Sequence, residues 1–247
     1  VGDVVSEPRA VKKACGNRVL YEHPDSSLPP AGIGGVLGPN GTGKTTLFRM
    51  IMGLEQPTEG TFRVGPTVKL AYVDQQHKSI DPEKTVYEVI SQGADLITLG
   101  NRQVNARAYV ARFNFSGADQ EKKCGMLSGG ERNRLHLALA LKEEGNVLLL
   151  DEPTKGMDGA FKEEFGALLR ALCAQGTAVC IVSHDVEFCA QYADRCGLLF
   201  RGEVVTENTA RAFFSGNYFY TTAAARIARA AAPGAVLCGE VVQCLTD

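Results

Sequence analysis

Residues 38–46 have the sequence Gly38-Pro39-Asn40-Gly41-Thr42-Gly43-Lys44-Thr45-Thr46. This run fits the pattern G-x-x-x-x-G-K-[ST], in which a glycine-rich loop holds phosphate groups. Glycine lacks a Cβ atom, so the backbone N–H groups of such a loop can approach phosphate oxygens and form a concave anion site. Lys44 can then reach the β- and γ-phosphates, and Thr45 can offer its hydroxyl to Mg²⁺. The pattern therefore predicts a site for a nucleoside triphosphate.

The flanking residues place this loop between a strand and a helix. Apolar Ile33, Val36 and Leu37 precede the loop and predict a short buried strand. The apolar-rich residues 47–52 follow and predict a helix that begins near Gly43. The N-terminal end of a helix carries partial positive charge, so it favours a bound phosphate. The order strand, loop, helix is the context in which the motif is meaningful.

The composition is that of an ordinary globular chain. Its 247 residues suffice for one large α/β domain or two small ones, and 45% of them are hydrophobic. The net charge of −2 gives no support to bulk binding of nucleic acid or of an anionic membrane. No apolar run approaches the roughly 18 residues of a membrane span, and no signal peptide is visible. We therefore expect a cytoplasmic protein that meets a membrane only through a partner.

The 8 cysteines predict neither a zinc site nor a disulfide framework. No Cys-x-x-Cys pair occurs, which removes the spacing that zinc and thioredoxin-like sites use. A chain of this length without a secretory signal is not expected to depend on disulfides. Most of the cysteines have apolar neighbours, so we interpret them as reduced thiols that pack as small core residues.

The remaining sequence alternates between predicted strands and helices. The strands are expected at 18–21, 61–64, 68–73, 147–150 and 177–183, with a hairpin over 196–205. Residues 79–126 are expected to be mostly helical, and further helices are expected at 128–145, 160–174, 186–193 and, in an alanine-rich tail, from 208 to about 232. Ser128 and Glu131 have the spacing of a capping box, which predicts that a helix begins at this point.

Polar residues occur at the points where the predicted strands end. Asp151 and Glu152 follow the apolar run 147–150, and Gln75 and His184 follow two other strands. Because the carboxyl ends of parallel strands lie along one edge of a sheet, we expect these side chains to gather near Lys44. An aspartate in this place anchors Mg²⁺, and the adjacent glutamate can accept a proton from an attacking water. The set predicts hydrolysis of the bound nucleotide.

The combination resembles the ATP-binding cassette (ABC) ATPases. Residues 38–185 contain, in the family's order, the phosphate loop, a glutamine loop, Leu-Ser-Gly-Gly-Glu, Leu-Leu-Leu-Asp-Glu-Pro-Thr, a D-loop aspartate and a switch histidine. The resemblance implies an α/β fold: a phosphate-loop NTPase core with a mostly parallel sheet, an N-terminal antiparallel β part and a helical insert. It further implies an ATPase domain over 1–207, with the insert at about 79–143, and a C-terminal helical tail over 208–247.

The resemblance also implies a role for each motif residue. The nucleotide would be bound by Gly38, Pro39, Asn40, Gly41, Thr42, Gly43, Lys44, Thr45, Thr46, Ser128, Gly129, Gly130 and Asp158. Among these, the Leu-Ser-Gly-Gly-Glu residues would contact ATP bound to the opposite cassette of a head-to-tail homo- or heterodimer. Mg²⁺ would be held by Thr45, Gln75 and Asp151. Glu152 would be the general base, His184 would steady the γ-phosphate, and Lys44 and Gln75 would complete the catalytic group.

The two halves of the chain resemble different subfamilies. Residues 16–153 are similar to the second cassette of ABC-F translation factors of the translational throttle type, above all in the runs 67–75, 107–115 and 130–136. Residues 153–243 resemble the ATPases of energy-coupling-factor importers, in the runs 153–158, 182–189 and 214–222. ABC-F proteins have Asn-Asp-Leu-Asp where this chain has Lys155-Gly156-Met157-Asp158. The chain therefore resembles a hybrid of the two subfamilies.

Three functions follow from these resemblances. The first is the energising subunit of an energy-coupling-factor-type importer, located at the inner face of the membrane on a membrane coupling protein. The alternative is an ABC-F-type translation factor module that acts on the ribosome, with the insert as its docking element. The third is a weak or inactive nucleotide-binding module, because Cys15 stands where many cassettes place an aromatic residue against adenine. None of them implies sequence-specific binding of nucleic acid.

Overall fold

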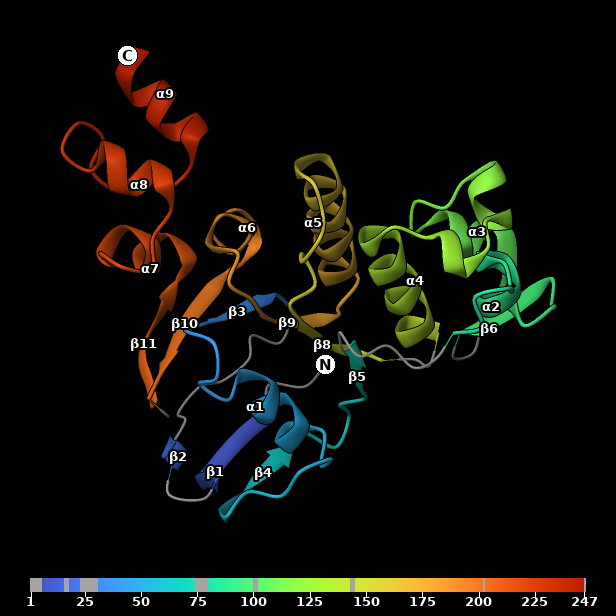
Figure 1. Ribbon diagram of the computed structural model, residues 1–247, viewed down its shortest axis with the longest axis horizontal. Helices are drawn as coiled ribbons and strands as arrows, with labels where there is room; N and C mark the ends of the chain where they lie inside the picture. Colours follow the sequence, from blue (N-terminus) through green and yellow to red (C-terminus); the bar gives the residue numbers. More distant parts are fainter. Residues whose placement is uncertain are drawn as a thin grey trace.

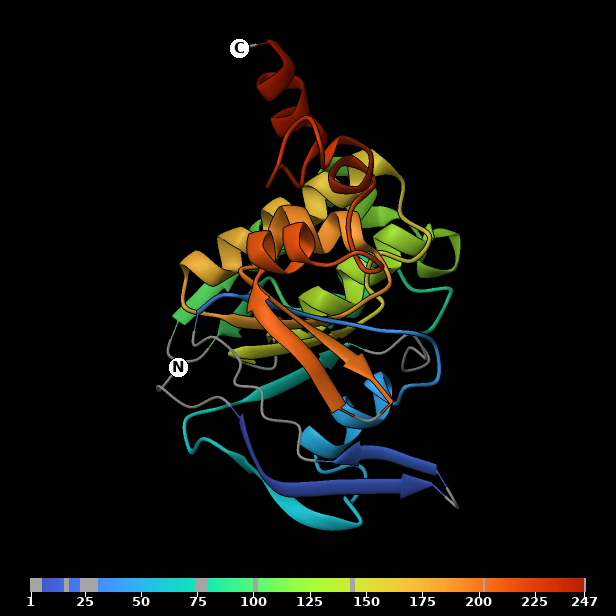
Figure 2. The same cartoon turned by 90° about the vertical axis from the view of Figure 1, so that its left-hand side faces the viewer.

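In the part of the chain that it describes, the structure, a computed structural model, contains a six-stranded sheet, a three-stranded sheet and a two-stranded hairpin. The described residues are 6–15, 18–22, 31–73, 80–99, 102–142, 145–201 and 203–246. Helices lie on both faces of the larger sheet, and the three-stranded sheet lies beyond one of these helical layers (Figures 1 and 2).

The larger sheet has the strand order β11-β10-β3-β9-β8-β5. Neighbouring strands are parallel, except that β10 and β11 form an antiparallel pair at one edge. The mostly parallel sheet that the sequence predicted is thus confirmed. The strands are β3 (Ile33–Leu37), β5 (Leu70–Val73), β8 (Val147–Asp151), β9 (Ala178–Val182), β10 (Arg195–Phe200) and β11 (Glu203–Thr209).

Strand β8 is buried on both faces because successive side chains point into two different apolar cores. Leu148 and Leu150 pack in the core under the helices of one face. Val147 and Leu149 pack on the other face against Phe48 of α1 (Lys44–Ile51). All residues of β8 are buried, so the continuous apolar run has the burial expected of a central parallel strand.

Most of the helices lie on the face opposite α1. This layer contains α4 (Gly129–Lys142), α5 (Gly159–Ala174), α6 (Val186–Tyr192) and α7 (Ala210–Gly216) (Figure 2). The tail continues with α8 (Ala223–Ala228) and α9 (Cys238–Thr246), which project away from the sheet (Figure 1). The helix predicted from 208 to about 232 is thus interrupted between α7 and α8, and α9 extends the helical tail beyond residue 232. Throughout the described ranges, no helix has both the length and the apolar character that crossing a membrane requires.

The smaller sheet has the order β2-β1-β4, with antiparallel pairing throughout. It contains β1 (Ser6–Cys15), β2 (Arg18–Glu22) and β4 (Glu59–Val64). This is the N-terminal antiparallel part that the resemblance implied. The sequence did not signal β1, because half of its 10 residues are polar or charged and one is Pro8.

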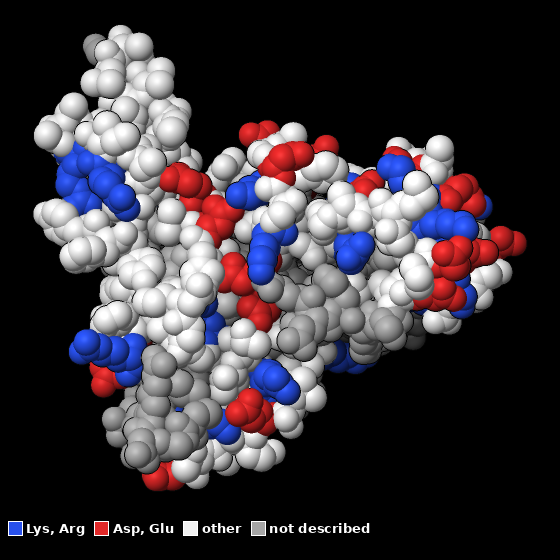
Figure 3. All heavy atoms as spheres, in the orientation of Figure 1, with Lys and Arg blue, Asp and Glu red and all other residues white. Residues whose placement is uncertain are grey.

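The insert between β5 and β8 is less helical than the sequence predicted. It contains α2 (Val86–Ser91), α3 (Ala106–Ala111) and two short 3₁₀ turns, η1 (Gly117–Glu121) and η2 (Cys124–Met126), before α4. The antiparallel strands β6 (Leu96–Leu99) and β7 (Arg102–Asn105) contradict the expected helix. Side chains alternate along β6, and this alternation turns Ile97 into the core, where it is 2% exposed. Acidic and basic side chains are interspersed over the insert, on the right of Figure 3.

The cysteines for which side chains are described carry no disulfide. The buried ones behave as the small core residues that the sequence predicted, and burial raises the pKa of the Cys180 thiol to about 12. They are Cys124, Cys173, Cys180, Cys189 and Cys196. Cys238 and Cys244 on α9 depart from the prediction, because both are exposed.

Replacing Gly166 with alanine is expected to destabilise the contact between α5 and α6. A Cβ atom at Gly166 would lie 2.4 Å from the Tyr192 ring. Overpacking of this kind costs about 1–3 kcal/mol in free energy of unfolding. Urea unfolding followed by circular dichroism measures the change. Gly159→Ala is the control, because a Cβ there meets nothing within 4 Å; equal midpoints for the two variants would contradict the packing described.

Candidate nucleotide-binding site

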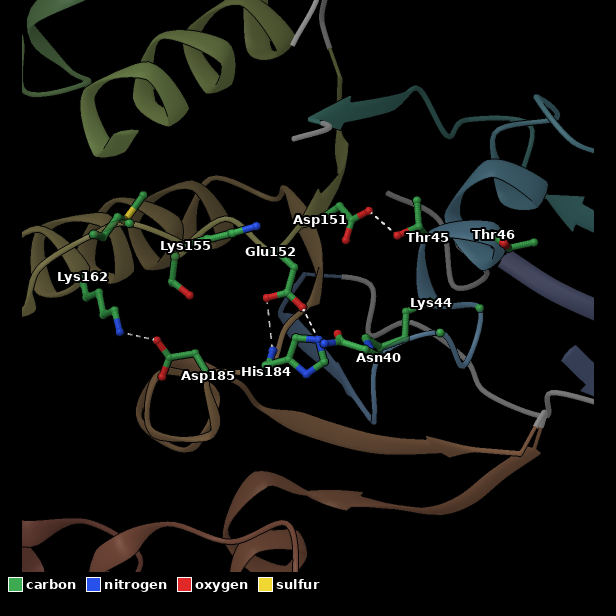
Figure 4. Close-up of a pocket in the computed structure, with 15 residues that line it drawn as sticks. Asn40, Lys44, Thr45, Thr46, Asp151, Glu152, Lys155, Lys162, His184 and Asp185 are labelled. Atoms are coloured by element: carbon green, nitrogen blue, oxygen red, sulfur yellow. Dashed lines mark hydrogen bonds and ion pairs between the residues drawn. The ribbon is translucent and has the colours of Figure 1, made fainter. Parts of the chain in front are cut away.

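The phosphate loop and the ends of β8 and β9 border one open cavity of about 910 Å³ (Figure 4). This volume lies within the range of ligand sites. One side is formed by the loop and the start of α1, and the other by the segment after β8 and the side of α5. The lining residues from the predicted set are Asn40, Gly41, Gly43, Lys44, Thr45, Thr46, Asp151, Glu152 and His184.

The backbone of the phosphate loop adopts conformations that favour glycine. Gly41 and Gly43 have φ values of 72° and 94°, in the region that glycine enters without strain. At Gly38 a Cβ atom would lie 2.2 Å from the carbonyl oxygen of Leu199. The Thr42 hydroxyl donates to the Pro39 carbonyl at 3.0 Å. The glycines therefore permit a tight loop whose end, at Gly43, is the N-cap of α1.

Lys44 is folded against the loop that precedes it. Its ammonium donates to the carbonyl oxygens of Gly38 at 2.9 Å and Pro39 at 2.8 Å. Its Nζ atom lies 3.5 Å from Nε2 of His184. Burial lowers the pKa of Lys44, and the carboxylates of Glu152 and Asp151 oppose that shift. A buried cation between a phosphate loop and two carboxylates suits a ligand that carries several negative charges and a divalent cation.

Thr45 and Asp151 meet across the cavity. The Thr45 hydroxyl donates to Oδ2 of Asp151 at 2.7 Å, and the Tyr72 hydroxyl approaches the same oxygen at 3.4 Å. Asp151 is buried at the end of β8. A hydroxyl and a carboxylate are hard oxygen ligands of the kind that Mg²⁺ takes, usually together with waters and substrate phosphates. The donor set therefore fits a Mg²⁺-nucleotide.

Glu152 faces His184 from a strained backbone position. Its φ is 50°, a region that is uncommon for residues other than glycine and costs conformational energy. The backbone N–H of Glu152 donates to the carbonyl of Val182 at 2.8 Å, which holds the residue against β9. Oε2 accepts from the backbone N–H of His184 at 3.2 Å, and Oε1 lies 3.0 Å from Nε2 of the ring (Figure 4). Carboxylate, imidazole and the Lys44 ammonium therefore converge.

Several lining residues were not among the predicted site residues. Lys155 extends from the segment after β8 into the cavity (Figure 4). Lys162 of α5 forms an ion pair with Asp185 at 2.5 Å. Asp185 could have been suspected, because it directly follows His184 and its position suits a helix N-cap. Lys162 gives no local signal, since its partner belongs to a different element. The others are Thr154, Gly156 and Met157.

A family model described as "ABC transporter" matches residues 21–155, more than half of the chain. The chain belongs to the ABC transporter family. It is accordingly an ATPase cassette of the ABC type, and the family named by the resemblance is confirmed.

The curated relatives of this cassette include translational throttle proteins. It is 49% identical over 220 residues to the "Energy-dependent translational throttle protein EttA" of Mycobacterium tuberculosis strain H37Rv. It is 47% identical over 218 residues to the protein of the same name from Escherichia coli K12. Each match covers 88% of the chain, which spans only 38% of the length of these relatives.

Solved structures of ABC cassettes share the fold. The chain superposes with a TM-score of 0.71 on cbiO1 of Clostridium perfringens, described as part of the ABC transporter complex cbiONQ, at 22% identity. That match covers 86% of this chain and 91% of the other. A dimeric bacterial cassette, MJ0796, gives a TM-score of 0.69 at 24% identity, with 83% of this chain and 99% of that one covered. At these identities the likeness carries the fold alone.

The Leu-Ser-Gly-Gly-Glu segment of this ABC cassette lies outside the cavity. Ser128 and Glu131 form the expected capping box: the Glu131 N–H donates to Ser128 Oγ at 3.2 Å, and the Ser128 N–H donates to Glu131 Oε2 at 2.9 Å. Ser128 and Gly129 are exposed, whereas Gly130 is buried near Met157 and Phe161. The structure therefore does not bring these residues to the nucleotide cavity of their own chain.

Three further positions are either structural or undescribed. Asp158 is exposed and caps α5, because its Oδ1 accepts from the Phe161 N–H at 2.9 Å. Gln75 lies in 74–79, outside the described residues. The backbone of Cys15 belongs to β1, but its side chain is likewise outside what the structure describes. The lack of an aromatic contact to adenine at this position therefore stays a prediction.

Proposed function

We propose that this cassette binds Mg²⁺-ATP in the cavity of Figure 4 and hydrolyses it with Glu152 as the general base. The carrying observation is that Lys44, the Thr45–Asp151 pair and the Glu152–His184 pair face one another across a single cavity. Phosphoryl transfer needs chiefly positioning and charge stabilisation, and these side chains supply both. Among the described residues, the catalytic groups Lys44, Glu152 and His184 also argue against an inactive module.

Each side chain has a distinct task in this proposal. The backbone N–H groups of the phosphate loop and the Lys44 ammonium bind the β- and γ-phosphates. Thr45 and Asp151 would hold Mg²⁺, which when bound neutralises charge on the phosphate oxygens. Glu152 accepts the proton of the attacking water. His184, held between Glu152 and Lys44, donates a hydrogen bond to the γ-phosphate and stabilises the charge that develops there.

The exposed signature segment supports a head-to-tail pair of cassettes. Ser128 and Gly129 stand at the N-terminal end of α4 and are exposed. A helix N-terminus with accessible glycine N–H groups attracts anions, and this one does not face the cavity of its own chain. In the proposed pair it contacts the ATP of the second cassette, so that ATP joins the two and hydrolysis separates them.

We propose further that hydrolysis serves translation, in the manner of an ABC-F factor in the cytoplasm. The throttle proteins match the chain at 47–49% identity along 88% of its length, whereas the ABC transporter cassette cbiO1 shares the fold at 22% identity. These comparisons support the translation reading over the importer subunit that the sequence put first. In this proposal the insert, with α2, α3 and the β6–β7 hairpin, is the element that docks on the ribosome.

Trapping the ATP-bound state is expected to retain the chain on ribosomes. The Glu152→Gln variant with Mg²⁺-ATP should co-sediment with purified ribosomes through a sucrose cushion, because the ATP state persists when the base is absent. Lys44→Ala is the control, since a variant that binds no ATP cannot reach that state. Sedimentation that is independent of both substitutions would contradict the proposal. Binding to membrane coupling proteins instead would favour the importer.

A further inference from the structure

An ion pair joins the two elements that flank the catalytic end of the cavity. Lys162 lies on the first turn of α5, and Asp185 immediately follows His184. The Lys162 ammonium lies 2.5 Å from Oδ2 of Asp185, and both side chains line the cavity (Figure 4). Their side chains are 34% and 16% exposed. The proposed hydrolysis assigns no role to either residue.

Asp185 uses its two carboxylate oxygens for different contacts. Oδ1 accepts from the Phe188 N–H at 3.0 Å and so caps the N-terminus of α6. Oδ2 pairs with Lys162. The Asp185 N–H donates to the buried Ser183 hydroxyl at 3.0 Å. The helix cap can therefore be kept while the ion pair is removed, because asparagine caps a helix about as well as aspartate does.

His184 depends on this turn for its position. The residue lies between Ser183 and Asp185, and its side chain is 42% exposed, so packing alone does not hold the ring. Its ring makes polar contacts to Glu152 and Lys44. Movement of the turn would displace Nε2 from both partners at once. Errors of about 1 Å in a catalytic group can cost large factors in rate.

We infer that Lys162 is a positioning residue for hydrolysis, whose ion pair with Asp185 fixes the turn that presents His184 to Glu152 and the γ-phosphate. This inference rests on the proposed function. The ion pair also links the start of α5 to His184. The start of α5 directly follows the segment that carries Glu152 and Asp158. A partner that contacted this segment would thereby have a physical route to the catalytic side chains.

The test is a double-mutant cycle on ATP turnover. Lys162→Met is expected to lower kcat about tenfold while KM and the Kd for ATP stay within about twofold, because the phosphate contacts are untouched. Asp185→Asn should produce a similar loss, and the double variant should lose no more than either single one. Lys162→Arg should restore most of the turnover, since it can still pair with Asp185.

Arg170 supplies the matched control on the same helix. Its ion pair with Asp194 at 2.7 Å is more exposed, at 42% and 41%, and neither residue lines the cavity. Arg170→Met is expected to leave kcat unchanged, because the pair lies outside the cavity. It should also leave the fold intact, because exposed pairs of this kind contribute little to global stability. Wild-type kcat in Lys162→Met, or losses that add in the double variant, would overturn the inference. If Glu152→Gln also hydrolysed ATP normally, the proposed function itself would fail.

Discussion

Replacing Glu152 with glutamine is expected to lower ATP turnover about a hundredfold or more, while ATP binding stays near the wild-type value. General base catalysis contributes about 10²–10⁴ in rate, and glutamine keeps the size of the side chain without accepting a proton. The Glu152 carboxylate is within 3.2 Å of the His184 N–H and 3.0 Å of its ring nitrogen. Glutamine can preserve the first of these contacts, so the site should keep its shape. The ATP-bound pair of cassettes should accumulate.

Two readouts separate loss of the base from loss of the fold. Phosphate release reports turnover, and equilibrium titration with a labelled ATP analogue reports binding. Glu163→Gln is a suitable control, because Glu163 is an exposed carboxylate on α5 that does not line the cavity. Unchanged turnover in Glu152→Gln would show that another group activates the water.

Replacing Lys44 with alanine should weaken ATP binding at least about a hundredfold. A hydrogen bond to a charged group contributes about 1.5–3 kcal/mol, and Lys44 is positioned to make such bonds to two phosphates. Each 1.4 kcal/mol corresponds to about a tenfold change in Kd. Burial lowers the pKa of this ammonium because the charged form has lost contact with water. A polyanionic ligand replaces that lost solvation, which strengthens its binding to Lys44.

The control for this variant addresses both charge and folding. Lys84→Ala removes the same charge from an exposed position on the insert, so it should bind ATP normally. Circular dichroism melting checks that Lys44→Ala remains folded, since the carbonyls of Gly38 and Pro39 lose the lysine donor and only the Pro39 carbonyl keeps the Thr42 hydroxyl. Tight ATP binding by a folded Lys44→Ala variant would contradict the assignment of the phosphate loop.

The centre of the site could be predicted from the sequence because its signals are local. The glycines of the phosphate loop and Lys44 are contiguous, and the structure shows positive φ values at Gly41 and Gly43. Asp151 and Glu152 follow the run 147–150, which contains no polar residue. Such a continuous apolar run predicts a strand that is buried on both faces, as β8 is. The capping box of Ser128 and Glu131 is likewise set by spacing along the chain.

Features that depend on contacts between distant segments left no such signal. Lys162 and Asp185 meet because α5 and α6 pack against each other, and nothing in the spacing of either helix shows it. The polar side chains of β1 give it little strand preference. The strand forms because its backbone pairs with β2 and β4, which the sequence of β1 alone does not show. The β6–β7 hairpin was hidden within a stretch whose neighbours are helical.

The phosphate loop and the acidic residues are expected to hold one nucleotide and one divalent cation together. Electron paramagnetic resonance with Mn²⁺ in place of Mg²⁺ measures this directly. With a non-hydrolysable ATP analogue, Mn²⁺ should bind with phosphorus hyperfine coupling, and both Lys44→Ala and Asp151→Asn should lose this signal. Equal Mn²⁺ binding without nucleotide, or a coupled signal that survives both substitutions, would contradict a shared site.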